Sequence, residues 1–145
     1  MYNVTLIPGD GIGPEVANAT KAVVDATGIQ INWEEVNAGE AVYEKVGTLV
    51  PDEVYASIEK NRLALKGPIT TPIGKGFRSI NVMLRTKYDL YSNVRPSRNF
   101  KGIDTPFNNV NMTIFRENTE GLYIGEEKVV DNNTTEATKR ITRSG

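Results

Sequence analysis

Three arginines lie at positions from which they could grip the carboxylate groups of a small molecule. Arg85 lies within a predicted helix, Arg95 at the end of the strand that follows it, and Arg116 directly after the segment "NVNMTIF". A guanidinium group makes two parallel, charge-assisted hydrogen bonds to a carboxylate. Because the ends of neighbouring strands meet at one edge of a sheet, the three side chains could converge. The alternative is that each is an ordinary solvent-exposed arginine.

The helix predicted for residues 79–87 adds a serine and an amide to Arg85. If Ser79 is its N-cap, the hydroxyl lies beside free backbone N–H groups at the positive end of the helix dipole, which favours an anion. Asn81 and Arg85 are four residues apart and share one face, while the apolar residues of the helix can face the core. This combination predicts a pocket for a polyanionic small molecule, with a plain capped amphipathic helix as the alternative.

Tyr123 follows Arg116 by seven residues, in the segment "RENTEGLY". This segment is too polar to bury an aromatic ring for packing alone. A tyrosine near cations can act as a proton donor or relay. The other interpretation is a tyrosine at an interface or on an edge strand.

The residue types that are missing exclude several classes of chemistry. The 145 residues contain no cysteine and no histidine. Disulfides, cysteine nucleophiles, serine–histidine hydrolase sites and imidazole-bound zinc are therefore excluded, and any metal would be a hard, oxygen-bound ion such as Mg²⁺ or Mn²⁺. A net charge of −1 predicts no nucleic-acid or anionic-membrane partner, and no apolar run is long enough to span a membrane. We therefore expect a soluble protein of the cytoplasm, or of a compartment reached by a signal already removed.

The stretch "VTLIPGDGIGPEV" predicts a strand, a glycine-rich turn and a helix. A dinucleotide-binding fingerprint requires a glycine at the position of Pro14. We therefore expect Gly9, Gly11 and Gly13 to shape a tight turn that starts a helix, rather than to cradle a phosphate.

Strands and helices alternate along the first half of the chain, which predicts a mostly parallel sheet covered by helices. The predicted elements are a strand at 4–7, a helix at 14–27, a strand at 29–33, helices at 40–46 and 52–60, a strand in "RLALKG", the helix at 79–87 and a strand in "LYSNVRP". From Ser97 the chain changes to short strands and polar turns, in "NVNMTIF", in "LYIG" and in the threonine-rich tail. We place a domain boundary near Tyr91.

Four motifs, taken together and in order, resemble the decarboxylating β-hydroxyacid dehydrogenases, which include isocitrate, 3-isopropylmalate, homoisocitrate and tartrate dehydrogenases. They are "IPGDGIGPE", "LKGPITTPIGKGFRSINVMLR", "DLYSNVRP" and "FRENTEGLYIG", and they cover essentially the whole chain. The resemblance implies an α/β, isocitrate/isopropylmalate dehydrogenase-like fold that is incomplete in this chain. Residues 1–90 would form the N-terminal part of the large α/β domain, and residues 91–145 the start of the small domain and a dimer arm.

The resemblance also implies which residues bind the substrate. Ser79, Asn81 and Arg85 match the S-x-N-x-x-x-R pattern with which isocitrate dehydrogenases bind the extra carboxylate, where isopropylmalate enzymes carry an apolar pair. By the same comparison, Arg95 and Arg116 would clamp the other carboxylates.

The remaining roles implied by the resemblance concern the reaction and the nicotinamide. Tyr123 would protonate the enolate that remains after carbon dioxide leaves. Lys66 would lie near the substrate, and Thr70 and Thr71, with Asn81, would lie beside the substrate and the nicotinamide.

The implied reaction is oxidation of the isocitrate hydroxyl by hydride transfer to NAD, with NADP possible, followed by loss of the β-carboxylate with the help of Mg²⁺ or Mn²⁺. The family's metal-binding aspartates and proton-relay lysine have no match here, so we expect this chain to supply the substrate-binding half of a site and to be inactive alone. A homodimer or higher homo-oligomer is implied, in the mitochondrial matrix if the source is a eukaryote. The alternatives are a non-catalytic subunit, an anion-binding module, or a 3-isopropylmalate or homoisocitrate dehydrogenase.

Overall fold

The computed structural model describes residues 1–70 and 79–143, which form two compact units, Met1–Ile80 and Asn81–Gly145. Thr71, for which we predict a contact with the nicotinamide, lies outside the described residues. The assignment of residues 1–90 and 91–145 to two domains of a complete protein stays a prediction. No helix in the described part of the chain has the length and apolar character needed to cross a membrane.

The first unit is built on a three-stranded parallel sheet in the order β2-β1-β3, which confirms the predicted parallel α/β arrangement. Its strands are β1 (Tyr2–Ile7), β2 (Ile31–Glu35) and β3 (Ala64–Lys66). The end of β1 forms the centre of the core, because Leu6 and Ile7 are almost fully buried between the neighbouring strands and the helices.

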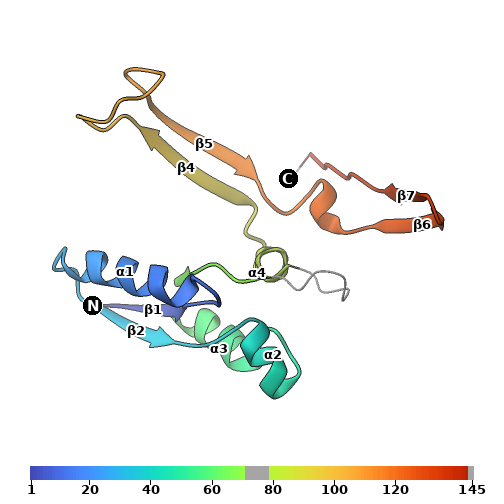
Figure 1. The fold of residues 1–145 in the computed structure, drawn as a ribbon, viewed down its shortest axis with the longest axis horizontal. Coiled ribbons are helices and arrows are strands. Elements are labelled where there is room, and N and C mark those ends of the chain that lie inside the picture. Colours follow the sequence, from blue (N-terminus) through green and yellow to red (C-terminus); the bar gives the residue numbers. More distant parts are fainter. Residues whose placement is uncertain (71–78, 144–145) are drawn as a thin grey trace. The chain divides into compact units, whose positions relative to one another are not determined.

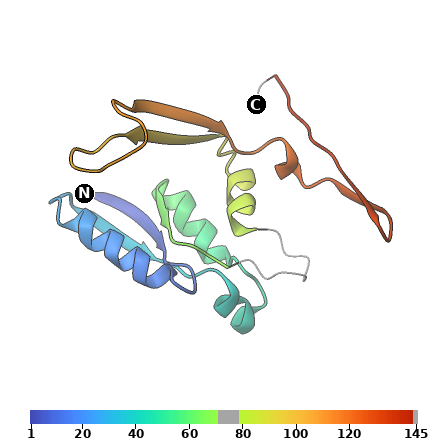
Figure 2. The ribbon, with the colours of Figure 1, turned by 45° about the horizontal axis from the view of Figure 1, so that its top comes forward.

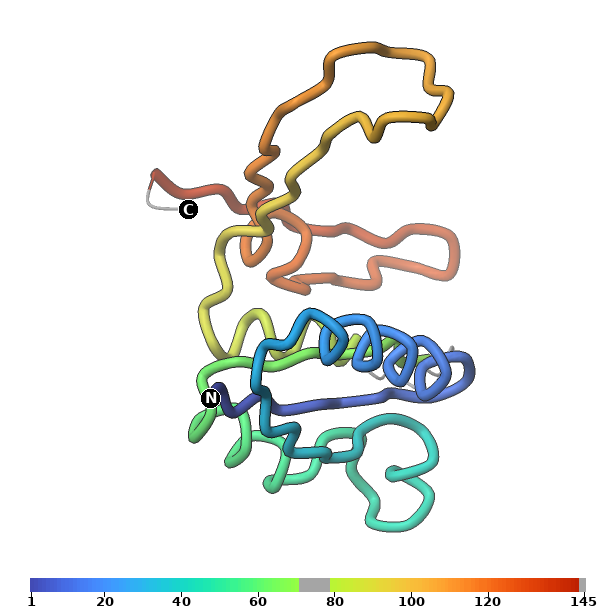
Figure 3. Tube along the Cα trace, turned by 90° about the vertical axis from the view of Figure 1, so that its left-hand side faces the viewer, coloured from blue at the N-terminus to red at the C-terminus, as the bar shows by residue number. Residues whose placement is uncertain are grey.

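The helices of the first unit lie on both sides of its sheet. Helix α1 (Gly13–Asp25) connects β1 to β2 on one side, and α2 (Glu40–Val46) and α3 (Asp52–Asn61) lie on the other (Figures 1 and 3). The physical reason is the right-handedness of crossover connections between parallel strands. The two connections run in opposite directions across the sheet and therefore place their helices on opposite faces.

The glycine-rich turn after β1 starts α1, as predicted. Gly9 and Gly11 have positive φ angles of 85° and 58°, and Pro14 lies in the first turn of the helix. A Cβ atom at Gly9 would lie 1.9 Å from the carbonyl oxygen of Pro68, and one at Gly13 would lie 2.4 Å from that of Pro8. These glycines are required because the backbones of two loops touch at this point.

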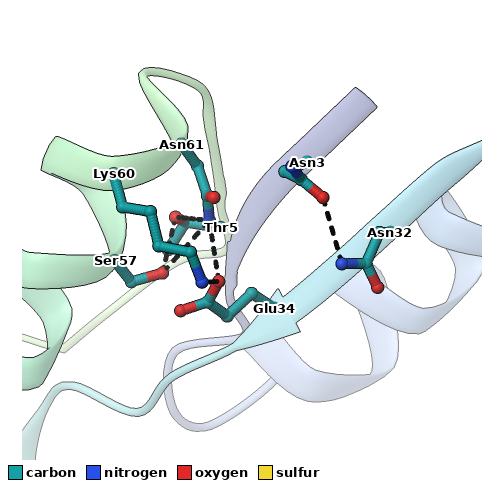
Figure 4. Close-up of polar contacts among 7 residues, drawn as sticks. All are labelled: Asn3, Thr5, Asn32, Glu34, Ser57, Lys60 and Asn61. Carbon is teal, nitrogen blue, oxygen red and sulfur yellow. Dashed lines mark hydrogen bonds and ion pairs between the residues drawn. The ribbon is translucent and has the colours of Figure 1, made fainter. Parts of the chain in front are cut away.

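A polar network attaches α3 to the sheet (Figure 4). Thr5 and Ser57 are buried, and their hydroxyl oxygens are 2.8 Å apart. The Asn61 amide donates to the Thr5 hydroxyl at 3.0 Å, and Lys60 donates to Glu34 at 2.7 Å. The hydrogen bonds from Lys60 and then Asn61 lower the pKa of Glu34. The network therefore aligns α3 with both β1 and β2.

The second unit consists of a helix followed by two antiparallel ribbons (Figure 2). Helix α4 (Ile80–Lys87) starts at the last residue of the first unit, and Ser79 is the residue immediately before it. The ribbons are β4 (Ser92–Arg98) with β5 (Asn111–Glu117), and β6 (Glu127–Asp131) with β7 (Thr134–Ala137).

One prediction for this unit is wrong, and one strand was not predicted. The segment "LYIG" is not a strand but a short 3₁₀ helix, η1 (Leu122–Ile124), because Gly121 and Gly125 on either side adopt positive φ angles of 74° and 68°. Strand β6 was not predicted, because its sequence "EKVVD" lacks a buried face and the strand depends on backbone pairing with β7.

Candidate functional site

Arg95 and Arg116 lie on the same face of the β4–β5 ribbon. Asn93 is paired directly with Arg116, and Arg95 is paired with Ile114. Since side chains alternate between faces along a strand, Arg95 shares the face of Asn93, and the two arginines are diagonal neighbours. The Nε atom of Arg95 donates to Oδ1 of Asn93 at 3.1 Å. The cross-strand register, rather than the meeting of strand ends at a sheet edge, brings the two cations together.

Tyr123, in the 3₁₀ helix η1, contacts one of these two arginines. The Nη2 atom of Arg116 donates a hydrogen bond to the Tyr123 hydroxyl, and the guanidinium carbon lies 5.7 Å from the centre of the tyrosine ring. Because the hydroxyl oxygen accepts the bond from Arg116, its own proton remains available for another acceptor. Arg116 is exposed and Tyr123 is half-buried, so a small anion can reach both.

Helix α4 carries two further candidate residues of the second unit. Arg85 is half-buried and Asn81, four residues earlier on the same face, is exposed, whereas Leu84 is buried. Leu90 joins this helix to the end of β5, because its N–H donates to the Arg85 carbonyl at 2.8 Å and its carbonyl accepts from the Asn118 amide at 3.2 Å. One backbone and one side-chain hydrogen bond, both made by Leu90, therefore connect the helix of Arg85 to the end of the strand of Arg116.

The other candidate residues belong to the first unit. Lys66 ends β3, is half-buried, and donates to the carbonyl of Gly67 at 2.6 Å. Thr70 has an exposed side chain, and its backbone N–H is bound by Asp10. Ser79 is half-buried directly before α4.

Asp10 is a structural anchor that the sequence analysis missed. Its Oδ1 accepts from the Thr70 N–H at 2.6 Å and its Oδ2 from the Glu40 N–H at 3.2 Å, so one carboxylate joins three loops. Partial burial acts to raise the pKa of Asp10, but the hydrogen bonds from Thr70 and Glu40 and the charge of Lys66 outweigh it and lower the pKa. An acidic residue between two turn glycines was the available signal.

Replacing Asp10 with Asn should lower the free energy of unfolding of the native protein by about 1–2 kcal/mol, because only one amide oxygen can replace two acceptors. Folding lowers the pKa of Asp10, so the difference in unfolding free energy between wild type and Asp10→Asn should depend on pH. It should have its full size above about pH 5 and disappear as the pH falls below about 4. Urea unfolding at several pH values measures this difference. The matched control is Asp104→Asn, at an exposed carboxylate of the other unit. An Asp10→Asn penalty that persists undiminished at pH 2–3 would contradict the assignment.

Within residues 1–70 and 79–143, no three acidic side chains are grouped so that they could hold a metal ion. The described residues therefore do not fit a complete Mg²⁺ or Mn²⁺ site.

Comparison with known proteins shows which family this chain resembles in sequence. The family model described as isocitrate/isopropylmalate dehydrogenase matches residues 3–145. The chain is 44% identical over 142 residues to the mitochondrial isocitrate dehydrogenase (NAD) subunit 2 of Kluyveromyces lactis, covering 98% of this chain and 38% of that protein. It is 45% identical over 142 residues to the mitochondrial isocitrate dehydrogenase (NAD) subunit alpha of Homo sapiens, covering 98% of this chain and 39% of that protein.

A solved structure shows the same fold. The crystal structure of isocitrate dehydrogenase from Methylococcus capsulatus matches with a TM-score of 0.90 and 48% sequence identity, over 99% of this chain and 44% of that one. The chain thus spans less than half the length of each of these proteins.

Proposed function

Because this chain belongs to the isocitrate/isopropylmalate dehydrogenase family, we propose that it supplies the substrate-binding part of an NAD-dependent isocitrate dehydrogenase. The reaction is the oxidative decarboxylation of isocitrate to 2-oxoglutarate. The observation that carries the proposal is that Arg95 and Arg116 are diagonal neighbours on the β4–β5 ribbon, and that Arg116 donates to the hydroxyl of Tyr123, a possible proton donor in η1.

The arginines act first by binding and orienting the substrate. Isocitrate carries three carboxylates, and Arg95 and Arg116 present two guanidinium groups from one face of the ribbon. Each can form paired, charge-assisted hydrogen bonds to a carboxylate. Ser79, Asn81 and Arg85, on and just before α4, bind the remaining carboxylate. The family resemblance is the support for including Lys66 among the substrate-binding residues.

Tyr123 then donates a proton. Once carbon dioxide has left, the enolate carbon needs a proton, and the Tyr123 hydroxyl can donate its own because Arg116 occupies the oxygen and not the hydrogen. Bound NAD would supply the hydride acceptor. The exposed side chains of Thr70 and Asn81, which can both form hydrogen bonds, suit a contact with the nicotinamide.

The complete native enzyme that carries this segment should prefer isocitrate to 3-isopropylmalate. An isopropyl group would leave the polar groups of Ser79 and Asn81 unpaired, which costs about 1–3 kcal/mol, or roughly 5–150-fold in kcat/KM. The measurement is NAD or NADP reduction followed by absorbance, with homoisocitrate as a third substrate. Equal kcat/KM values for isocitrate and 3-isopropylmalate would refute the substrate assignment.

The same assay separates the other candidate functions. A non-catalytic subunit or an anion-binding module would bind isocitrate without turnover. The contact between Arg116 and Tyr123 favours the enzyme, because a module that only binds anions gains nothing from a proton donor.

We also propose that the protein forms a homodimer or higher homo-oligomer. The β4–β5 ribbon and its connection leave three phenylalanines, Phe100, Phe107 and Phe115, more than 70% exposed, and apolar groups of this kind commonly mark an interface. The two mitochondrial relatives are named as subunits.

In a eukaryote we place this protein in the mitochondrial matrix, and otherwise in the cytoplasm.

A further inference from the structure

The carboxylate of Glu117 caps the turn between Arg116 and Tyr123. Its Oε1 atom accepts three hydrogen bonds: from the Thr119 N–H at 2.5 Å, from the Thr119 hydroxyl at 2.9 Å and from the Glu120 N–H at 2.8 Å. Burial acts to raise the pKa of Glu117, but these bonds outweigh it and lower the pKa, so the acceptor is charged at neutral pH. A charged acceptor with three donors holds the first half of the turn in one conformation.

The rest of the turn is attached to other parts of the second unit. Asn118 is only 5% exposed and donates to the Leu90 carbonyl. The N–H of Gly121 donates to the Arg140 carbonyl at 2.7 Å. The Glu120 carboxylate accepts from the N–H and the hydroxyl of Thr142, both at 2.6 Å. These contacts therefore hold the chain reversal between Arg116 and Tyr123 along one path.

The contact between Arg116 and Tyr123 depends on this path. Pairing between β4 and β5 fixes Arg116 opposite Asn93. Tyr123 lies beyond the end of β5 in η1, where no ladder holds it, so the turn decides where its hydroxyl lies. An error of about 1 Å in the position of a reacting group can cost about a hundredfold in rate.

We propose that Glu117 is a positioning residue of the decarboxylation reaction, which it serves by holding the turn that keeps the Tyr123 hydroxyl against Arg116. This inference rests on the proposed function. Glu117 itself needs no contact with the substrate, since the three hydrogen bonds that its Oε1 atom accepts all come from the turn.

The test compares three variants of the complete native enzyme. Glu117→Ala should lower kcat with isocitrate about 10–100-fold and change KM less than about threefold, because the arginines stay in place. Glu117→Gln keeps an oxygen acceptor and should recover most of the lost kcat. Asp131→Ala is the matched control, because Asp131 caps another turn of the same unit, through the Asn133 N–H at 2.7 Å, without leading to Tyr123. It should keep the wild-type kcat.

A double mutant tests whether Glu117 acts through Tyr123. If it does, Glu117→Ala should lower kcat little or not at all in a Tyr123→Phe background, because the group that it positions is already gone. The proposal would be overturned if the fold losses in kcat of the two single variants multiplied fully in the double mutant. It would also be overturned if Glu117→Ala kept the wild-type kcat. A purely structural role would lower stability without this coupling.

A readout independent of turnover separates this inference from the proposed function. The ¹³Cζ resonance of Tyr123 in labelled enzyme should move in Glu117→Ala and in Arg116→Gln, but not in Asp131→Ala. A wild-type enzyme without isocitrate turnover would refute the proposed function, and the resonance would then decide the positioning claim. If the Tyr123 resonance were the same in wild type and in Glu117→Ala, the claim that Glu117 positions Tyr123 would be overturned.

Discussion

Tyr123→Phe should lower kcat for conversion of isocitrate to 2-oxoglutarate by about 10²–10⁴-fold, the usual contribution of a positioned general acid. The substitution removes only the hydroxyl that accepts from Arg116. The ring can keep its place 5.7 Å from the guanidinium carbon, so the fold and KM should change little. Steady-state reduction of NAD, with 2-oxoglutarate quantified separately, measures the loss.

Tyr91→Phe provides the control for this loss. Tyr91 belongs to the same unit, is 66% exposed, and lies just before β4 rather than beside Arg116. Its replacement should leave kcat unchanged. If Tyr123→Phe retained the wild-type kcat as well, Tyr123 would not be the proton donor.

Ser79→Asp should weaken isocitrate binding by roughly a thousandfold. The substitution places a negative charge where we propose that a substrate carboxylate binds. Two like charges about 4 Å apart near a protein surface repel by about 4 kcal/mol at an effective dielectric constant of about 20. Asp is as good an N-cap as Ser, so α4, which starts at the next residue, should still form. Isothermal titration of isocitrate measures the change in affinity.

Ser79→Asn is the matched neutral variant, because it has nearly the shape of Asp and also caps helices well. It should weaken isocitrate binding far less than Ser79→Asp. Equal losses in the two variants would show that size rather than charge matters at Ser79, and would remove the argument for a carboxylate site there.

Local patterns in the sequence were enough to identify most elements and the candidate residues. The spacing of apolar residues and the breaks at glycine and proline located α2 at its observed bounds, and α1, α3 and α4 to within about two residues. These signals lie within a few residues of the element that they specify, so no knowledge of distant contacts was needed. The four motifs carried the family assignment for the same reason.

Only the tertiary structure decided how these residues are brought together. The bond from Thr70 to Asp10 joins residues sixty positions apart, and the placement of Arg95 beside Arg116 depends on the register between β4 and β5. No periodicity in the sequence encodes such a pairing. The segment "LYIG", predicted as a strand, forms η1 after the turn capped by Glu117. The positive φ angles of Gly121 and Gly125, together with the pairing of Gly121 with Arg140, outweigh the strand tendency of this segment. The sequence by itself thus determined which groups are candidates for the chemistry, and long-range backbone pairing decided which of them meet.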